Sequence, residues 1–166
     1  MKNILIVYGS NSGNTQNIAK QIGTKLKDYE VKLLEVTKVT KEDIENATNL
    51  ILGTPTWGMG DLQDDWDIFL PKFKNFELSG KTVALFGLGD SSSYADTFVD
   101  GIGLIYEAIL NKNCKFTGQT DIAGYSFSDS KALVNGMFVG LPLDEDNEEN
   151  LTDSRVDEWI KKLDFQ

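Results

Sequence analysis

Two kinds of hydrophobic pattern alternate along the chain. Continuous apolar runs predict strands that are buried on both faces, because a half-exposed strand would alternate apolar and polar residues. These runs lie at 4–8, 50–53 and 82–86. Residues 31–36 mix charges into a β-rich run, which is typical of a strand at the edge of a sheet. Apolar residues spaced three or four apart indicate helices. The helices are expected at 14–27, 41–46, 66–73, 98–109 and 156–163, with Thr152 and Asp153 as candidate caps of the last one.

A fifth strand is predicted in two pieces. Residues 115–117 and 137–141 are both β-like, and the polar, glycine-rich segment 118–136 separates them. We interpret them as two halves of one edge strand that a loop splits; a single strand followed by a disordered connection is the alternative. The splitting loop is interpreted either as a surface for a partner or as passive stabilisation of the sheet edge. Because strands alternate with helices, the pattern predicts an α/β fold with a parallel sheet covered on both faces.

Composition narrows the class of protein. The 166 residues suit one compact domain spanning 1–166. A net charge of −10 argues against nucleic acid or an anionic membrane as a partner, and favours basic protein partners or simply solubility. There is no histidine, so the commonest general base and metal ligand is missing, and we expect no metal site. A lone cysteine, Cys114, and no apolar run of transmembrane or signal-peptide length favour the cytoplasm.

A polar loop follows the first predicted strand. It reads Gly9-Ser10-Asn11-Ser12-Gly13-Asn14-Thr15, and a helix is expected to begin at its end. The order strand, tight loop, helix aims several backbone N–H groups at one point, with the helix dipole behind them. An anion could therefore bind at this loop without a basic side chain, although an ordinary strand-to-helix turn has the same pattern. A P-loop is excluded because Asn14 stands where that motif needs lysine.

Two further polar loops, 54–61 and 87–94, follow other predicted strands. Each contains one large aromatic residue, Trp57 in the first and Tyr94 in the second. Ligands of open α/β sheets bind at the carboxyl ends of the strands, where these loops would meet the first loop. A flat aromatic ligand with a phosphate tail would suit the three loops, with the tail at 9–15 and the ring between the two aromatic side chains. Taken singly, either aromatic residue could instead be a lid over the core.

These three loops carry a resemblance to a known family. Residues 10–15 fit the pattern Ser/Thr-x-Ser/Thr-Gly-x-Thr, 56–61 read Thr-Trp-Gly-Met-Gly-Asp, and Gly-Leu-Gly-Asp at 87–90 precedes Tyr-Ala-Asp at 94–96. Together with the split last strand, they make the chain similar to the flavodoxins, and to their long-chain group. The resemblance implies a flavodoxin-like, doubly wound three-layer sandwich with a five-stranded parallel sheet in the order 2-1-3-4-5.

The resemblance also implies the cofactor FMN and its contacts. The first loop would hold the phosphate, Trp57 would stack on the inner face of the flavin ring, and Tyr94 on the outer face. The backbone near Gly89 and Asp90 would meet the pyrimidine edge, and Asp146 would reach the ribityl chain. The implied FMN-binding residues are Ser10, Asn11, Ser12, Gly13, Asn14, Thr15, Thr56, Trp57, Gly58, Met59, Gly60, Leu88, Gly89, Asp90, Tyr94 and Asp146.

The function that the resemblance implies is low-potential, one-electron transfer between redox enzymes, through the semiquinone/hydroquinone couple of FMN. No catalytic side chain is expected, because the flavin carries the chemistry and the protein tunes it. The implied partners are basic-surfaced redox proteins, such as NAD(P)H-dependent flavodoxin or ferredoxin reductases and 2-oxoacid oxidoreductases, and the chain is expected to be a monomer. The alternative is an FMN-dependent reductase, or a ribonucleotide-reductase-associated flavoprotein, of the same fold.

Overall fold

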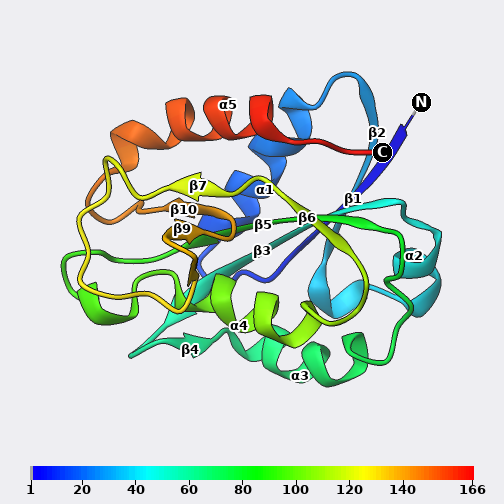
Figure 1. Cartoon of the computed structure of the whole chain (residues 1–166), viewed down its shortest axis with the longest axis horizontal. Coiled ribbons are helices and arrows are strands. Elements are labelled where there is room, and N and C mark those ends of the chain that lie inside the picture. Colours follow the sequence, from blue (N-terminus) through cyan, green and yellow to red (C-terminus); the bar gives the residue numbers. More distant parts are fainter. Residues whose placement is uncertain (1) are drawn as a thin grey trace.

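A computed structural model of the chain describes residues 2–166 and shows a three-layer α/β sandwich (Figure 1). The central strands are β1 (Lys2–Tyr8), β2 (Tyr29–Glu35), β3 (Asn49–Trp57), β5 (Thr82–Leu88), β6 (Lys115–Thr117) and β10 (Leu141–Leu143). They are all parallel, and they lie in the order β2-β1-β3-β5, with β6 and β10 both paired to the outer side of β5. The predicted order 2-1-3-4-5 is therefore confirmed, with the fifth position shared by two short strands.

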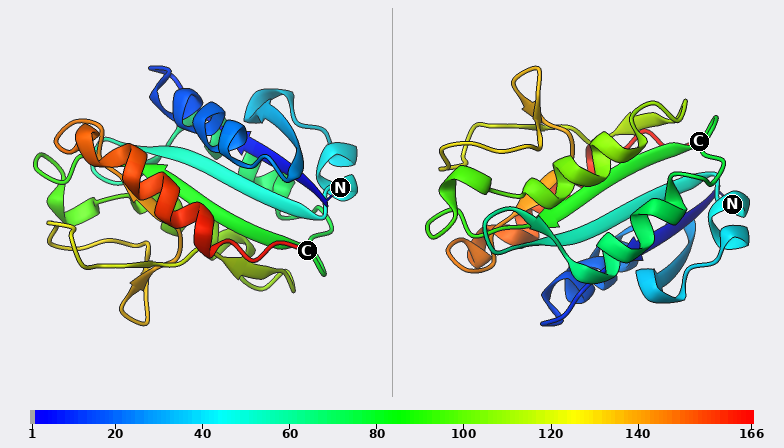
Figure 2. Two further views of the ribbon diagram at one scale, coloured as in Figure 1. Left: turned by 90° about the horizontal axis from the view of Figure 1, so that it is seen from above. Right: turned by 90° about the horizontal axis from the view of Figure 1, so that it is seen from below.

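Helices cover both faces of this sheet (Figure 2). One face carries α1 (Asn14–Lys25) and α5 (Thr152–Lys162); the other carries α2 (Lys41–Asn46), α3 (Asp64–Phe73) and α4 (Asp100–Ile109). Single-turn 3₁₀ helices are η1 (Val36–Lys38), η2 (Ala95–Thr97) and η3 (Glu149–Leu151). Because successive side chains of a strand point to opposite faces, Ile4 and Ile6 of β1 pack with α1 and α5, while Leu5 and Val7 pack with α3 and α4.

Several element boundaries differ from the predicted ones. Strand β3 does not stop at residue 53; it continues to Trp57, because its last two residues pair antiparallel with β4 (Asp61–Leu62). Helix α4 begins at Asp100 and not at 98, since Val99 adopts a left-handed conformation with φ 49°. Thr152 does not cap α5, because its hydroxyl donates a hydrogen bond to the Glu145 carboxylate.

The second half of the split strand was predicted at the wrong residues. Leu141–Leu143 pairs with β5, whereas Met137–Phe138 (β9) joins a separate antiparallel sheet with β7 (Thr120–Asp121) and β8 (Leu133–Val134). The reason is the turn between β8 and β9: Asn135 and Gly136 both have positive φ, 53° and 80°. That conformation belongs to a two-residue hairpin, which reverses the chain before β10 begins.

The segment between β6 and β10 is ordered by packing on Phe98, which lies two residues before α4. Tyr125, Phe127 and Phe138 surround the fully buried Phe98 with ring centroids 5.8–6.1 Å away. The alternative of a disordered connection is therefore wrong. Between Lys2 and Gln166, no helix is both long and apolar enough to cross a membrane.

Candidate functional site

A cavity of about 390 Å³ opens at the carboxyl ends of the strands, where the three polar loops meet. Its volume lies within the range of small-molecule sites. The lining residues are Ser12, Asn14, Thr15, Pro55, Thr56, Trp57, Gly58, Leu88, Gly89, Asp90, Tyr94, Thr97, Glu145 and Asp146. The three predicted loops therefore converge, and a fourth segment, 145–146, completes the wall.

The first loop presents free backbone donors at one end of the cavity. Gly13 is the N-cap of α1 and adopts φ 91°. The first hydrogen bond of the helix runs from the Asn17 N–H to the Gly13 carbonyl, 3.0 Å. The Gly13 N–H donates to Ser10 Oγ at 3.0 Å, so the loop closes on itself. The N–H groups of 14–16 have no carbonyl partner within the helix, and no acidic residue lies in its first turn. This end of the cavity therefore suits an anion.

The second loop is a tight hairpin that positions an aromatic residue. Trp57 ends β3 and pairs with Asp61, and the Gly60 N–H donates to the Trp57 carbonyl at 3.2 Å. The turn needs glycine twice, since φ is 49° at Gly58 and 98° at Gly60. Met59 lies at the tip and is 83% exposed. The hairpin thus holds the Trp57 ring on the cavity while its tip faces solvent.

The start of α4 fixes this hairpin from behind. The Thr56 hydroxyl accepts a 3.0 Å hydrogen bond from the Gly101 N–H. Gly101 is itself required by the close approach, because a Cβ there would lie 2.8 Å from the Pro55 carbonyl oxygen. The buried Asp100 accepts a 2.7 Å bond from the Lys131 N–H, which connects the same helix end to the long loop.

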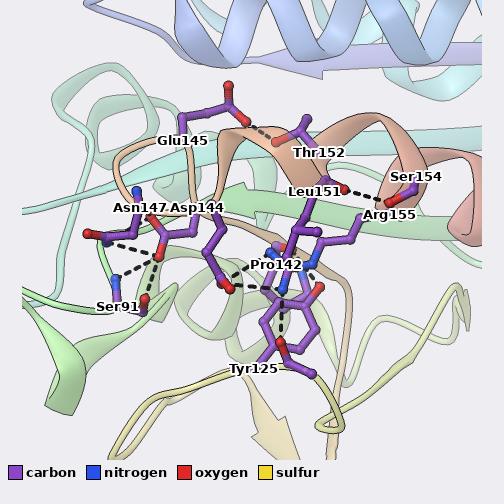
Figure 3. A network of polar contacts seen from close by, with 12 residues as sticks. Ser91, Tyr125, Pro142, Asp144, Glu145, Asn147, Leu151, Thr152, Ser154 and Arg155 are labelled. Atoms are coloured by element: carbon purple, nitrogen blue, oxygen red, sulfur yellow. Dashed lines mark hydrogen bonds and ion pairs between the residues drawn. The ribbon is translucent and has the colours of Figure 1, made fainter.

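The third loop is joined to the segment after β10 (Figure 3). Asp144 is fully buried and accepts hydrogen bonds from the Ser91 hydroxyl and from the N–H groups of Ser91 and Asn147. The Asn147 side chain donates to Asp90 at 2.9 Å. Donation from the Ser93 N–H and from Asn147 holds the pKa of Asp90 below its usual range. These contacts hold the loop that carries Asp90 and the aromatic residue Tyr94, both of which line the cavity.

The cavity wall is negatively charged, because its lining residues include acidic side chains but no lysine or arginine. Asp90, Glu145 and Asp146 all face the cavity. Burial raises the pKa of Asp146, and the neighbouring charges of Asp90 and Asp144 raise it further. An anionic group is therefore favoured only at the N-terminus of α1, and the rest of the cavity suits a neutral or electron-poor ring.

Most predicted site residues line the cavity, but not all. Outside the lining are Ser10, Asn11, Gly13, Met59 and Gly60. Ser10, Gly13 and Gly60 shape the loops that hold their neighbours, and Asn11 is held by Gln63. The lining residues that the sequence analysis missed are Pro55, Thr97 and Glu145. Pro55 and Glu145 directly adjoin predicted residues, so extending each motif by one position would have found them.

Comparisons with known proteins agree with this geometry. The family model described as Flavodoxin matches residues 6–159. A flavodoxin of Nostoc sp. is 41% identical over 162 residues, which covers 98% of this chain and 95% of the relative; one of Helicobacter pylori is 43% identical and covers 98% and 97%. A crystal structure of Fusobacterium nucleatum flavodoxin bound to flavin mononucleotide superposes with a TM-score of 0.92 at 37% identity, covering 97% of this chain and 96% of that one. The chain belongs to the flavodoxin family.

Proposed function

We propose that the chain binds FMN non-covalently in the cavity and carries single electrons between redox enzymes. One observation supports this above the others. The same cavity joins free N–H groups at the start of α1 to two aromatic side chains on separate loops, Trp57 and Tyr94. That combination fits a ligand with an anionic tail and a flat ring. The likeness to a flavodoxin structure with bound flavin mononucleotide supports the same ligand.

Each part of FMN has a chemically suitable wall. The phosphate would be held by the N–H groups of 14–16 and by the hydroxyls of Ser12 and Thr15, all of them neutral donors. The isoalloxazine ring would lie between Trp57 and Tyr94. Glu145 and Asp146 would reach the ribityl hydroxyls, which can donate to carboxylates. The backbone of Gly89 and Asp90 would meet the pyrimidine edge.

The bound FMN supplies the one-electron chemistry, and the residues of this chain set its energy. Asp90 and Asp146 lie on the cavity wall, and Asp61 lies in the hairpin, paired with Trp57. Negative charges near the ring oppose the addition of a second electron, so this chain would hold the second reduction at a low potential. The aromatic side chains also exclude water from the faces of the ring.

The net negative charge of the chain indicates the kind of protein partner that it binds. With 26 acidic and 16 basic residues, the chain should associate with redox proteins that present basic surfaces, such as NAD(P)H-dependent reductases or 2-oxoacid oxidoreductases. Monomeric behaviour and a cytoplasmic location belong to the same proposal. Association rates measured by stopped flow should fall as salt rises, because screening shortens the reach of the surface charges. Rates that are independent of salt would contradict this steering.

An absorption spectrum during stepwise reduction tests the main proposal. Protein reconstituted with FMN should accept electrons in two separate one-electron steps, and it should depend on a separate reductase for electrons from NAD(P)H. Rapid oxidation of NAD(P)H by the purified protein alone would favour the alternative, an FMN-dependent reductase. Failure of the apo-protein to bind FMN would refute both.

A further inference from the structure

Gln63 connects the first loop to α3, although it lies outside the cavity. It is completely buried and precedes α3, where its Oε1 accepts a 3.1 Å hydrogen bond from the Trp66 N–H. Its Nε2 donates to Asn11 Oδ1 at 2.6 Å and to Asp65 Oδ2 at 2.9 Å. The amide nitrogen of Gln63 therefore faces two acceptors, and its amide oxygen faces a donor. A flipped amide would face two oxygens with an oxygen.

Asn11 depends on this contact. Its side chain is exposed, and its one side-chain hydrogen bond within residues 2–166 is the one from Gln63. The loop is also held at its two ends, where the Gly9 N–H donates to the Gly53 carbonyl at 3.1 Å and the Gly13 N–H to Ser10 Oγ at 3.0 Å. Between these ends, the bond from Gln63 is the one that holds the Asn11 side chain. Glycine at position 9 leaves room for the Gln63 amide, since a Cβ there would lie 2.4 Å from Gln63 Oε1.

We infer that Gln63 is a positioning residue for the phosphate end of the site, which rests on the proposed binding of FMN. By holding Asn11, Gln63 restricts the adjoining Ser12 and the start of α1 to the conformation in which their donors face the cavity. A loop that is ordered before binding loses less entropy when the ligand arrives. Trp57 and Tyr94 lie on other loops, so the effect should concern the phosphate and not the ring.

Two single variants and their combination test this inference in the apo-protein with two ligands. Asn11→Ala removes the acceptor at an exposed position and leaves the hydrogen bond from the Trp66 N–H to Gln63 Oε1 intact. Gln63→Met keeps the length of the side chain and removes both its donor to Asn11 and its acceptor for the Trp66 N–H. Each should raise the Kd for FMN about three- to tenfold, the effect of one hydrogen bond, and leave the Kd for riboflavin, which lacks the phosphate, within about twofold. Asn17→Ala, one turn into α1 and exposed, is the matched control and should change neither.

The combined variant separates this inference from a direct contact. Since both substitutions remove the same hydrogen bond, the double variant should weaken FMN binding no more than the stronger single variant does. Amide hydrogen exchange at 10–13 should be faster in apo Asn11→Ala than in the apo wild type. Riboflavin binding shows that Gln63→Met is folded even if its melting temperature falls.

Three results would overturn the inference: FMN affinity unchanged in Gln63→Met, equal weakening of both flavins, or multiplying effects in the double variant. Loss of FMN affinity in Asn11→Ala alone would assign the phosphate contact to Asn11 itself. Wild-type protein that binds no FMN would instead refute the proposed function, so the two failures are distinguishable.

Discussion

Replacing Gly60 by alanine measures how closely the hairpin of the second loop packs on α4. Gly60 adopts φ 98°, and a Cβ there would lie 2.7 Å from Asp100 Oδ2 and 3.1 Å from Thr97 Cβ. Asp100 is 2% exposed, and its other carboxylate oxygen is held by the Lys131 N–H at 2.7 Å. Because this carboxylate cannot move aside without losing that bond, the hairpin itself must shift.

The free-energy cost has two parts. Left-handed backbone strain on alanine costs about 1–2 kcal/mol, and crowding in a packed region about 1–3 kcal/mol. We expect Gly60→Ala to lower the free energy of unfolding by about 3 kcal/mol. Gly80 is the matched control: it has φ 79°, but nothing lies within 4 Å of its Cβ position. Gly80→Ala should therefore cost only the strain, about 1 kcal/mol after the gain from a less flexible unfolded chain.

Urea unfolding of the apo-proteins measures both costs. With a slope of about 2 kcal/mol per molar, the midpoint should fall by about 1.5 M for Gly60→Ala and about 0.5 M for Gly80→Ala. FMN titration adds a functional readout: affinity should fall in Gly60→Ala, because the hairpin carries Trp57, and remain unchanged in Gly80→Ala. Equal midpoints for the two variants would show that the contact with Asp100 does not constrain the hairpin.

Three further substitutions address a helix cap, the ring and the potential. Pairing with Lys32 and hydrogen bonds from Thr40 lower the pKa of Asp43 to about 2. Asp43→Ala should therefore lower the free energy of unfolding by about 1 kcal/mol at pH 7. The difference from wild type in urea unfolding should shrink as pH falls from about 4 towards 2, because the wild-type carboxylate is then protonated. A difference that stays constant over this pH range would contradict the prediction. Trp57→Ala should weaken FMN and riboflavin by the same factor, roughly tenfold or more, in fluorescence titrations; selective loss of FMN would contradict ring stacking. Asp146→Asn should raise the potential of the second one-electron reduction by roughly 40 mV, or about 1 kcal/mol, in a spectroelectrochemical titration. An unchanged potential would show that the charge of Asp146 does not affect this reduction.

The parts of the fold that the sequence predicted are those with local signals. Apolar runs marked β1, β3 and β5, and the parallel order of these strands brings their carboxyl ends together. The loops at those ends therefore had to meet, which is why residues as far apart as Thr15, Trp57 and Asp90 line one cavity. The error at β10 has a physical reason, because Pro142 argues against a strand. Proline is tolerated there since β10 lies at the edge of the sheet. Asn135-Gly136 was a hairpin signal that the prediction did not use.

Local sequence signals could not predict contacts between side chains that are distant in sequence. Gln63 meets Asn11 across 52 positions, and Asp144 meets Ser91 across 53. Neither pair has a spacing that a helix or strand period could reveal, since each depends on which loops the finished sheet places side by side. The residues that support a site are therefore harder to predict than the residues that line it.

The loop that splits the last strand illustrates the same limit. The sequence left two interpretations, a partner surface or stabilisation of the sheet edge. In the structure, the N–H groups of Ser128 and Asp129 donate to the Ala95 carbonyl, and the Asp129 carbonyl accepts from the Phe98 N–H. These bonds hold η2, the turn directly after Tyr94. Ile122, in the same loop, is 43% exposed. Because the inward side of the loop supports the backbone beside an aromatic residue of the cavity, this insertion contributes to the shape of the site itself, which neither interpretation had included.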